Sequence, residues 1–254
     1  GIPVLLIPFI MKSMPESLAY LSKNKKDLEL KQTIRLIEPN IQIDDVALLN
    51  ITDPTHAGSS VSYLFANGRG FSTIMFWVAF FTGLFMVYSL STWLTKLMAM
   101  SGYTLGSALS FVIALNIGGI IGAVGGGWLA DRMHIKWVLV SMYSLGSLFL
   151  YLMTLPMPIH MLYITIAVVG ACSTGAQIVA YSYCGQFYPS EIRSTGIGLA
   201  SGIGRLGAIG APLLIGMIMA LNLPIEQNFM VIAAAGLIGA IALSLINHNR
   251  SFSK

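Results

Sequence analysis

Long apolar runs separated by short polar links dominate the chain from residue 71 onward. Six of these runs are long enough to cross a lipid bilayer as helices, which takes about 20 apolar residues each. We expect the spans at residues 71–94, 105–129, 137–155, 161–183, 195–221 and 229–246. The pattern therefore predicts an all-α integral membrane protein with six complete transmembrane helices.

The first 70 residues follow a different pattern. Residues 1–11 are apolar but too few to cross a membrane, and we interpret them as the end of a truncated transmembrane helix. Residues 12–70 carry many charges, and their broken apolar face predicts short amphipathic helices within a loop. A separate small domain is disfavoured here, because too few apolar residues are present to form a core. The six-helix body would then occupy residues 71–247, followed by a tail at 248–254.

Composition and charge support a membrane location. The chain of 254 residues is 56% hydrophobic and only 9% charged, whereas a soluble domain is about 25% charged. Lysine and arginine gather in the links on one side of the spans, and Lys96 alone falls on the other side. The positive-inside rule makes the lysine-rich side cytoplasmic, together with the C-terminus. Because the basic residues lie beside the spans, the net charge of +4 does not indicate a nucleic-acid partner.

A single charge interrupts the fifth apolar run. Arg205 lies ten residues into this run, which places it roughly 15 Å deep and near the middle of the bilayer. A charge there costs about 2.5–3.5 kcal/mol or more, and it is tolerated mainly where it faces a bundle interior or a water-filled cavity. A permanent cation at that depth requires an anion, either a protein carboxylate or a substrate. We favour a substrate pocket over a structural ion pair or a side chain that reaches to the interface.

Polar and aromatic side chains at helical spacing extend this candidate pocket. The fourth and first spans carry one such stripe each: Ser173, Gln177, Tyr181 and Cys184, and Phe81, Phe85, Tyr88 and Thr92. Asn116 is the one amide near the middle of the second span. For Gln177 and Asn116, a hydrogen bond that joins two helices is an equal alternative. Around Arg205, these side chains would suit a small organic anion, including an aromatic one.

Acidic groups are missing from the interior of the expected spans. Asp131, Glu191 and Glu226 lie only at span ends. Proton-driven carriers commonly titrate a carboxylate inside the membrane, so a proton-carrying group would have to lie in a missing partner half. The sequence also lacks a phosphate loop, a nucleophile motif and a metal-ligand spacing. We therefore expect no cofactor, no metal and no enzymatic activity.

Glycines recur on the second and fifth spans. Gly118, Gly122 and Gly126 stand at a spacing that lets two membrane helices approach closely. Close helix contact is one interpretation, and contacts that slide during a transport cycle are the other. Pro212 is expected to kink the outer part of the fifth span.

Several motifs resemble those of the major facilitator superfamily. The segment Gly127-Trp128-Leu129-Ala130-Asp131-Arg132, with Lys136 after it, resembles the G-x-L-x-D-R-x-G-R-K signature of that superfamily, although His134 and Ile135 depart from it. Pro15-Glu16-Ser17 resembles the end of helix six. The run from Tyr188 to Gly196, followed by Gly204-Arg205-Leu206-Gly207 and Pro212, resembles the helix ten to eleven region of the aromatic acid/proton symporters.

The resemblance implies that the chain is one half of a twelve-helix carrier. This C-terminal half would consist of two three-helix inverted repeats, preceded by the end of helix six and a cytoplasmic loop, with substrate bound near the midplane between the two halves. Its function would be alternating-access symport of protons with small organic acids, in particular aromatic ones, in a bacterial inner membrane. Its partners would be the organic anion, protons, the lipid bilayer and the missing N-terminal half.

Two sets of residues follow from these arguments. We expect the substrate to be bound by Arg205, Tyr88, Asn116, Gln177 and Tyr181. We expect gating at the cytoplasmic side to use Asp131, Arg132, Lys136, Glu191 and Arg193. Two other functions stay open: a different facilitator branch that carries sugars, metabolites or drugs, and a six-span remnant of a carrier that does not transport.

Overall fold

A computed structural model describes residue 21 and residues 27–37, 61–221 and 223–248. The chain divides into two compact units, Gly1–Gly58 and Ser59–Lys254. In the first unit the amphipathic helix α3 (Asp27–Ile37) buries Leu30 and leaves Leu28 exposed. The expected helix end at 1–11, the Pro15-Glu16-Ser17 motif, most of the loop and nearly all of the tail lie outside the described residues.

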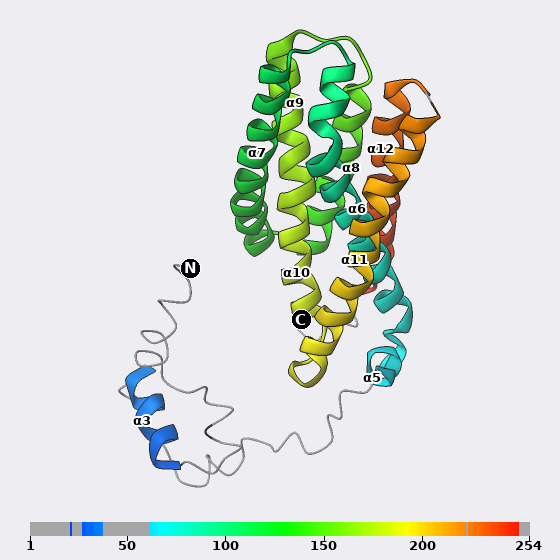
Figure 1. Cartoon of the computed structure of the whole chain (residues 1–254). Coiled ribbons are helices and arrows are strands. Elements are labelled where there is room, and N and C mark those ends of the chain that lie inside the picture. Colours follow the sequence, from blue (N-terminus) through cyan, green and yellow to red (C-terminus); the bar gives the residue numbers. More distant parts are fainter. Residues whose placement is uncertain (1–20, 22–26, 38–60, 222, 249–254) are drawn as a thin grey trace. The chain divides into compact units, whose positions relative to one another are not determined.

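The second unit is helical throughout its described part (Figure 1). Its elements are α5 (Ser62–Phe65), the 3-10 turn η1 (Ala66–Gly68), α6 (Gly70–Met100), α7 (Leu105–Arg132), α8 (Ile135–Leu152), α9 (Ile159–Gly170), the π-helical segment η2 (Ala171–Gly175), α10 (Ala176–Phe187), α11 (Ser190–Ala220) and α12 (Ile225–Leu245). The elements α9, η2 and α10 form one continuous span. Among the described residues of this unit, six helices are long and apolar enough to cross a membrane, which confirms the predicted number of spans.

Two expected links are shorter in the structure. Residues 62–68 lie in the stretch 12–70 expected as a loop with short helices, and they form α5 and η1, with α6 following directly from Gly70. The link expected between the spans 161–183 and 195–221 consists of only Tyr188 and Pro189. The reason is that Tyr188 turns inward: its ring packs against Gly196 and its hydroxyl donates to Thr73 Oγ1 at 2.9 Å. Pro189, in an extended conformation, then starts α11.

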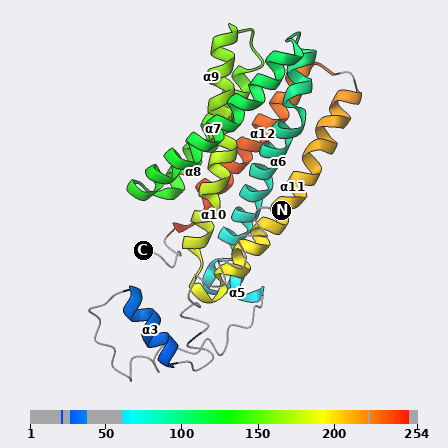
Figure 2. The ribbon, with the colours of Figure 1, turned by 60° about the vertical axis from the view of Figure 1, so that its left-hand side comes forward.

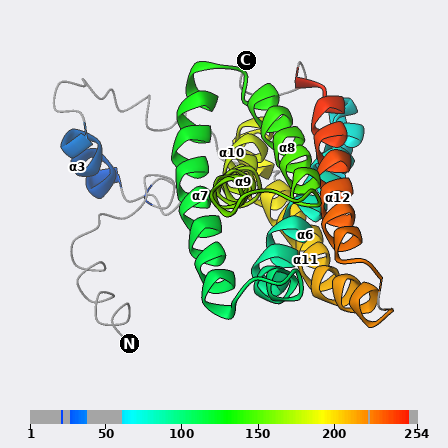
Figure 3. The same cartoon turned by 90° about the horizontal axis from the view of Figure 1, so that it is seen from above.

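The helices of the second unit form one bundle, in which α6 contacts α7, α10, α11 and α12 (Figures 2 and 3). Helix α6 packs along α11 and α12, while α7 packs along α9 and η2, and α8 packs against α12. Buried side chains line α6 along most of its length. By contrast, α7 and α11 expose long apolar stripes, as expected of helices that meet lipid or a further protein surface.

Glycines set the distance between α7 and the α9–η2 segment. A methyl group on Gly118 would overlap the carbonyl of Ala167, and one on Gly122 would overlap the backbone of Ala171. From the other side, a Cβ on Gly175 would lie 2.5 Å from the carbonyl carbon of Gly122. The predicted close helix contact is thus confirmed, and whether it slides remains a prediction.

Gly122→Val should destabilise the bundle by about 3 kcal/mol or more, because the side chain would enter a backbone contact that cannot open locally. The matched control is Gly125→Val on the same helix, where a Cβ meets nothing within 4 Å. The control should stay within about 0.5 kcal/mol of the wild type. Thermal unfolding of the purified chain in detergent measures both, and equal midpoints would contradict the packing described here.

Candidate functional site

Arg205 lies midway along α11 with an exposed side chain. Its Nη1 donates a hydrogen bond to the hydroxyl oxygen of Tyr88 on α6 at 2.9 Å. Among the residues that the structure describes, no carboxylate forms an ion pair with this guanidinium. Two members of the expected substrate site are therefore in direct contact, and the positive charge remains available to an anion.

Backbone packing brings α11 this close to α6. A Cβ on Gly207 would overlap the carbonyl oxygen of Phe81, and one on Gly204 would lie 2.7 Å from Leu84 Cδ1. Further along both helices, Trp93 Nε1 donates to the carbonyl oxygen of Pro212 at 3.2 Å. These contacts lie before and after the Arg205–Tyr88 pair along the helix axes. They therefore fix the axial position of Arg205 relative to Tyr88.

The side of α11 that carries Arg205 is uncovered in this chain. Gly198 and Gly202 are exposed, and a Cβ on either would meet nothing within 4 Å. We refer to Gly198, Gly202 and Arg205 together as the open face. The two glycines leave a flat backbone surface within two helical turns of the guanidinium.

Tyr181 of α10 reaches the edge of the open face. Its hydroxyl shares a hydrogen bond with Ser201 Oγ at 3.1 Å, and its ring meets Phe80 edge-on at 4.9 Å between centroids. Ser201 precedes Arg205 by one helical turn, about 6 Å along the axis. Sequence reasoning missed Ser201, although its position four residues before Arg205 places it on the same side of α11.

Gln177 lies inside the bundle, with 4% of its surface exposed. Its Oε1 accepts a hydrogen bond from the Tyr143 hydroxyl at 3.3 Å, and its Nε2 is enclosed without a partner. Gly83 makes room for both side chains, since a methyl group there would overlap them. Ser173 and Cys184 are buried as well, so Tyr181 alone of this stripe extends to the open face.

Asn116 lies on an exposed part of α7. Its amide donates to the Val112 carbonyl on the same helix at 2.8 Å, between the exposed side chains of Ile113 and Ile117. On α6, Phe85 is buried and Phe81 is partly exposed. The hydrogen bond of Asn116 thus stays within α7 and does not join it to Arg205.

The motif residues cluster where α7 ends and α8 begins. Asp131 and Arg132 are exposed, and the Arg132 guanidinium lies 4.1 Å from the centroid of the Trp128 ring. Lys136 Nζ donates to the Ile246 carbonyl at 2.8 Å and so caps the C-terminal end of α12, where a cation is favourable.

The two other expected gating residues belong to the first turn of α11. Arg193 is exposed there, and the side chain of Glu191 is outside the described residues.

Comparisons with known proteins agree with this architecture. The profile of the Major Facilitator Superfamily matches residues 112–252. The benzoate transport protein of Acinetobacter baylyi is 41% identical over 254 residues, which cover 99% of this chain and 54% of that protein. The gentisate transporter of Corynebacterium glutamicum is 39% identical over 175 residues, 68% of this chain and 39% of that protein. The 4-hydroxybenzoate transporter PcaK of Pseudomonas putida is 30% identical over 253 residues, 97% and 56% respectively. The chain spans about half the length of the curated relatives it matches.

A cysteine introduced at the open face should react readily with a water-soluble maleimide. The native thiols Cys172 and Cys184 are buried, so the folded wild-type chain should label slowly, whereas Gly202→Cys should gain one fast-reacting thiol. Denaturation in detergent should release the native thiols in both proteins. Mass spectrometry of the labelled chain measures this, and slow labelling at residue 202 would contradict an open face.

Proposed function

The chain belongs to the major facilitator superfamily, and from this premise we propose that it is the C-terminal half of a secondary transporter for small aromatic carboxylic acids. The observation that carries the proposal is the Arg205–Tyr88 pair, which holds an exposed cation midway along a membrane-spanning helix. The names of the three relatives, which all refer to aromatic acids, support the substrate class.

The carboxylate of the substrate would bind Arg205. A guanidinium presents a fork of donors that matches a carboxylate, and Tyr88 uses only Nη1. A charge-assisted hydrogen bond of this kind contributes about 1.5–3 kcal/mol. An empty site leaves the cation uncompensated in the membrane, at a cost of about 2.5–3.5 kcal/mol or more. Substrate binding therefore lowers the cost of closing the site, and this couples occupancy to alternating access.

The aromatic ring would lie along the flat surface at Gly202 and Gly198. Its far edge would then approach the hydrogen-bonded pair Tyr181 and Ser201, one helical turn from Arg205. A ring hydroxyl there could join this pair as donor and acceptor, because both protein groups are hydroxyls. Of the other expected pocket residues, Gln177 would contribute from the bundle interior through its unpartnered Nε2, and Asn116 from the exposed side of α7.

Proton coupling would depend on the other half of the carrier. In the six long helices, the acidic residues are Asp131, Glu191 and Glu226, and all three stand close to helix ends. The proton-carrying carboxylate would thus lie in the N-terminal half. In this half, Asp131 and Arg132, together with Glu191 and Arg193, would form a gate latch at the cytoplasmic side. We place the carrier in a bacterial inner membrane, with the C-terminus in the cytoplasm.

Arg205→Gln in the complete carrier should lower uptake of labelled benzoate about 100-fold, because the substrate carboxylate loses about 3 kcal/mol of interaction. Tyr88→Phe should lower it about tenfold, since the guanidinium keeps its charge and loses one orienting contact. Lys96→Gln, near the C-terminal end of α6, is the control and should transport normally. Uptake into cells with immunoblotted membrane levels measures the series, and full uptake by Arg205→Gln would refute the proposal.

Ser201→Ala and Tyr181→Phe should change selectivity rather than overall transport. We expect KM for 4-hydroxybenzoate to rise about fivefold, which corresponds to the free energy of one neutral hydrogen bond. KM for benzoate should stay nearly constant. Ser182→Ala is the matched control, because Ser182 neighbours Tyr181 on α10 and is exposed. Competition between the two acids gives the ratio directly. An equal rise in KM for both acids would mean that Tyr181 and Ser201 stabilise the fold and do not contact the substrate ring.

A further inference from the structure

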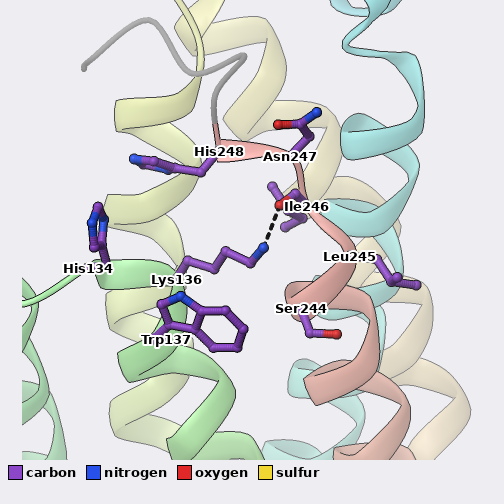
Figure 4. Close-up of a pocket in the computed structure, with 8 residues that line it drawn as sticks. All are labelled: His134, Lys136, Trp137, Ser244, Leu245, Ile246, Asn247 and His248. Atoms are coloured by element: carbon purple, nitrogen blue, oxygen red, sulfur yellow. Dashed lines mark hydrogen bonds between the residues drawn. The ribbon is translucent and has the colours of Figure 1, made fainter.

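A second site lies where α8 begins and α12 ends, and it shares no residue with the open face. A cavity of about 500 Å³ there is lined by His134, Lys136 and Trp137 from the start of α8 and by residues 244–248 (Figure 4). The lining side chains include one ammonium group and two imidazoles. Within this lining there is no carboxylate to balance them.

The electrostatics of the cavity favour an anion. The His134 and His248 rings lie 5.7 Å apart, and the pKa of His248 is lowered by burial and by the positive neighbours His134 and Lys136. The Nδ1 atom of His248 is enclosed without a hydrogen-bond partner. Lys136 Nζ gives one hydrogen bond to the Ile246 carbonyl (Figure 4), and an ammonium group has three donors. His134 is the N-cap of α8 but makes no side-chain cap, and the start of a helix is itself favourable for an anion.

The surroundings of the cavity point to lipid. Helix α12 ends at Leu245, so the cavity lies at the level where this span leaves the hydrocarbon region. Trp137 is 58% exposed at the cavity edge, and tryptophan is typical of the membrane interface. An exposed apolar stripe continues from the cavity along α12, formed by Ile238, Ile241 and Leu245. This stripe could receive acyl chains, which a soluble phosphate does not have.

We propose that this cavity binds the headgroup phosphate of an anionic phospholipid of the phosphatidylglycerol class. Lys136 and the imidazoles of His134 and His248 would contact the phosphate oxygens, as basic clusters beside membrane helices do. The Ser244 hydroxyl and the Asn247 amide line the same cavity and would face the polar part of the headgroup. The acyl chains would follow the apolar stripe of α12. This proposal depends on α8, α12 and the membrane, and not on the proposed transport function.

The test uses the purified chain in a neutral detergent, with thermal unfolding followed as lipid is added. Dioleoyl phosphatidylglycerol should raise the unfolding midpoint of the wild type in a saturable manner, and dioleoyl phosphatidylcholine should not. His134→Gln should weaken the apparent affinity for phosphatidylglycerol about fivefold, the value of one basic group at the surface. His160→Gln is the matched control, because His160 is also exposed but lies outside this cavity.

Further arms distinguish the lipid from other sources of the same chemistry. Inorganic phosphate without lipid should leave the midpoint unchanged, and an equal rise would overturn the lipid assignment. Equal stabilisation by phosphatidylcholine, or an unchanged affinity in His134→Gln, would overturn the site. Lys136→Gln also removes the cap on α12, so its basal midpoint can fall. Its lipid affinity relative to that lower baseline should still be reduced, and wild-type affinity in Lys136→Gln would also count against the site.

Discussion

A positive charge midway along an apolar helix is the constraint on which the candidate site depends. The guanidinium of Arg205 carries its charge on a planar fork of N–H donors, which requires oxygen acceptors. Among the described residues, the bundle supplies it with one neutral oxygen, from Tyr88, and no other acceptor for its remaining donors. The glycines at positions 204 and 207 make that contact possible, because larger residues would separate α11 from α6. The same two glycines therefore determine both the packing of α11 on α6 and the position of the charge.

Sequence reasoning was most successful where the length of an apolar run or a close backbone contact determines the structure. The number of spans follows from the thickness of the bilayer, and the close approach at Gly118 and Gly122 follows from the lack of a side chain. Sequence reasoning did not locate the short helix at Ser62–Phe65 or the left-handed turn at Asn67, because the polar composition of this stretch resembles that of a loop. The turn before α11 was also too long, since the inward contact of Tyr188 with Thr73 joins residues that are distant in sequence.

The candidate site could be predicted only in part, because helical spacing identifies residues on one face but not what covers that face. Gln177 and Tyr181 are one turn apart, yet Tyr143 covers the first and the second reaches Ser201. Lys136 illustrates the same limit. Its motif indicates a gate, whereas its contact with Ile246 joins two helices within this half. The gate role and the contact with Ile246 are physically compatible. An ammonium group has three donors, so it can cap a helix and still face an anion.

The π-helical segment η2 has a consequence for the fourth span as a whole. A turn closed by i→i+5 hydrogen bonds contains one residue more than an α-helical turn. Helices α9 and α10 are continuous, but the angular register of α10 is shifted relative to a straight continuation of α9. Winding this wide turn at the regular α-helical pitch, with all of its residues kept, would rotate α10 by about 100° about its axis. Tyr181 would then turn away from Ser201, so the orientation of this wall of the site is determined one and a half turns away from it.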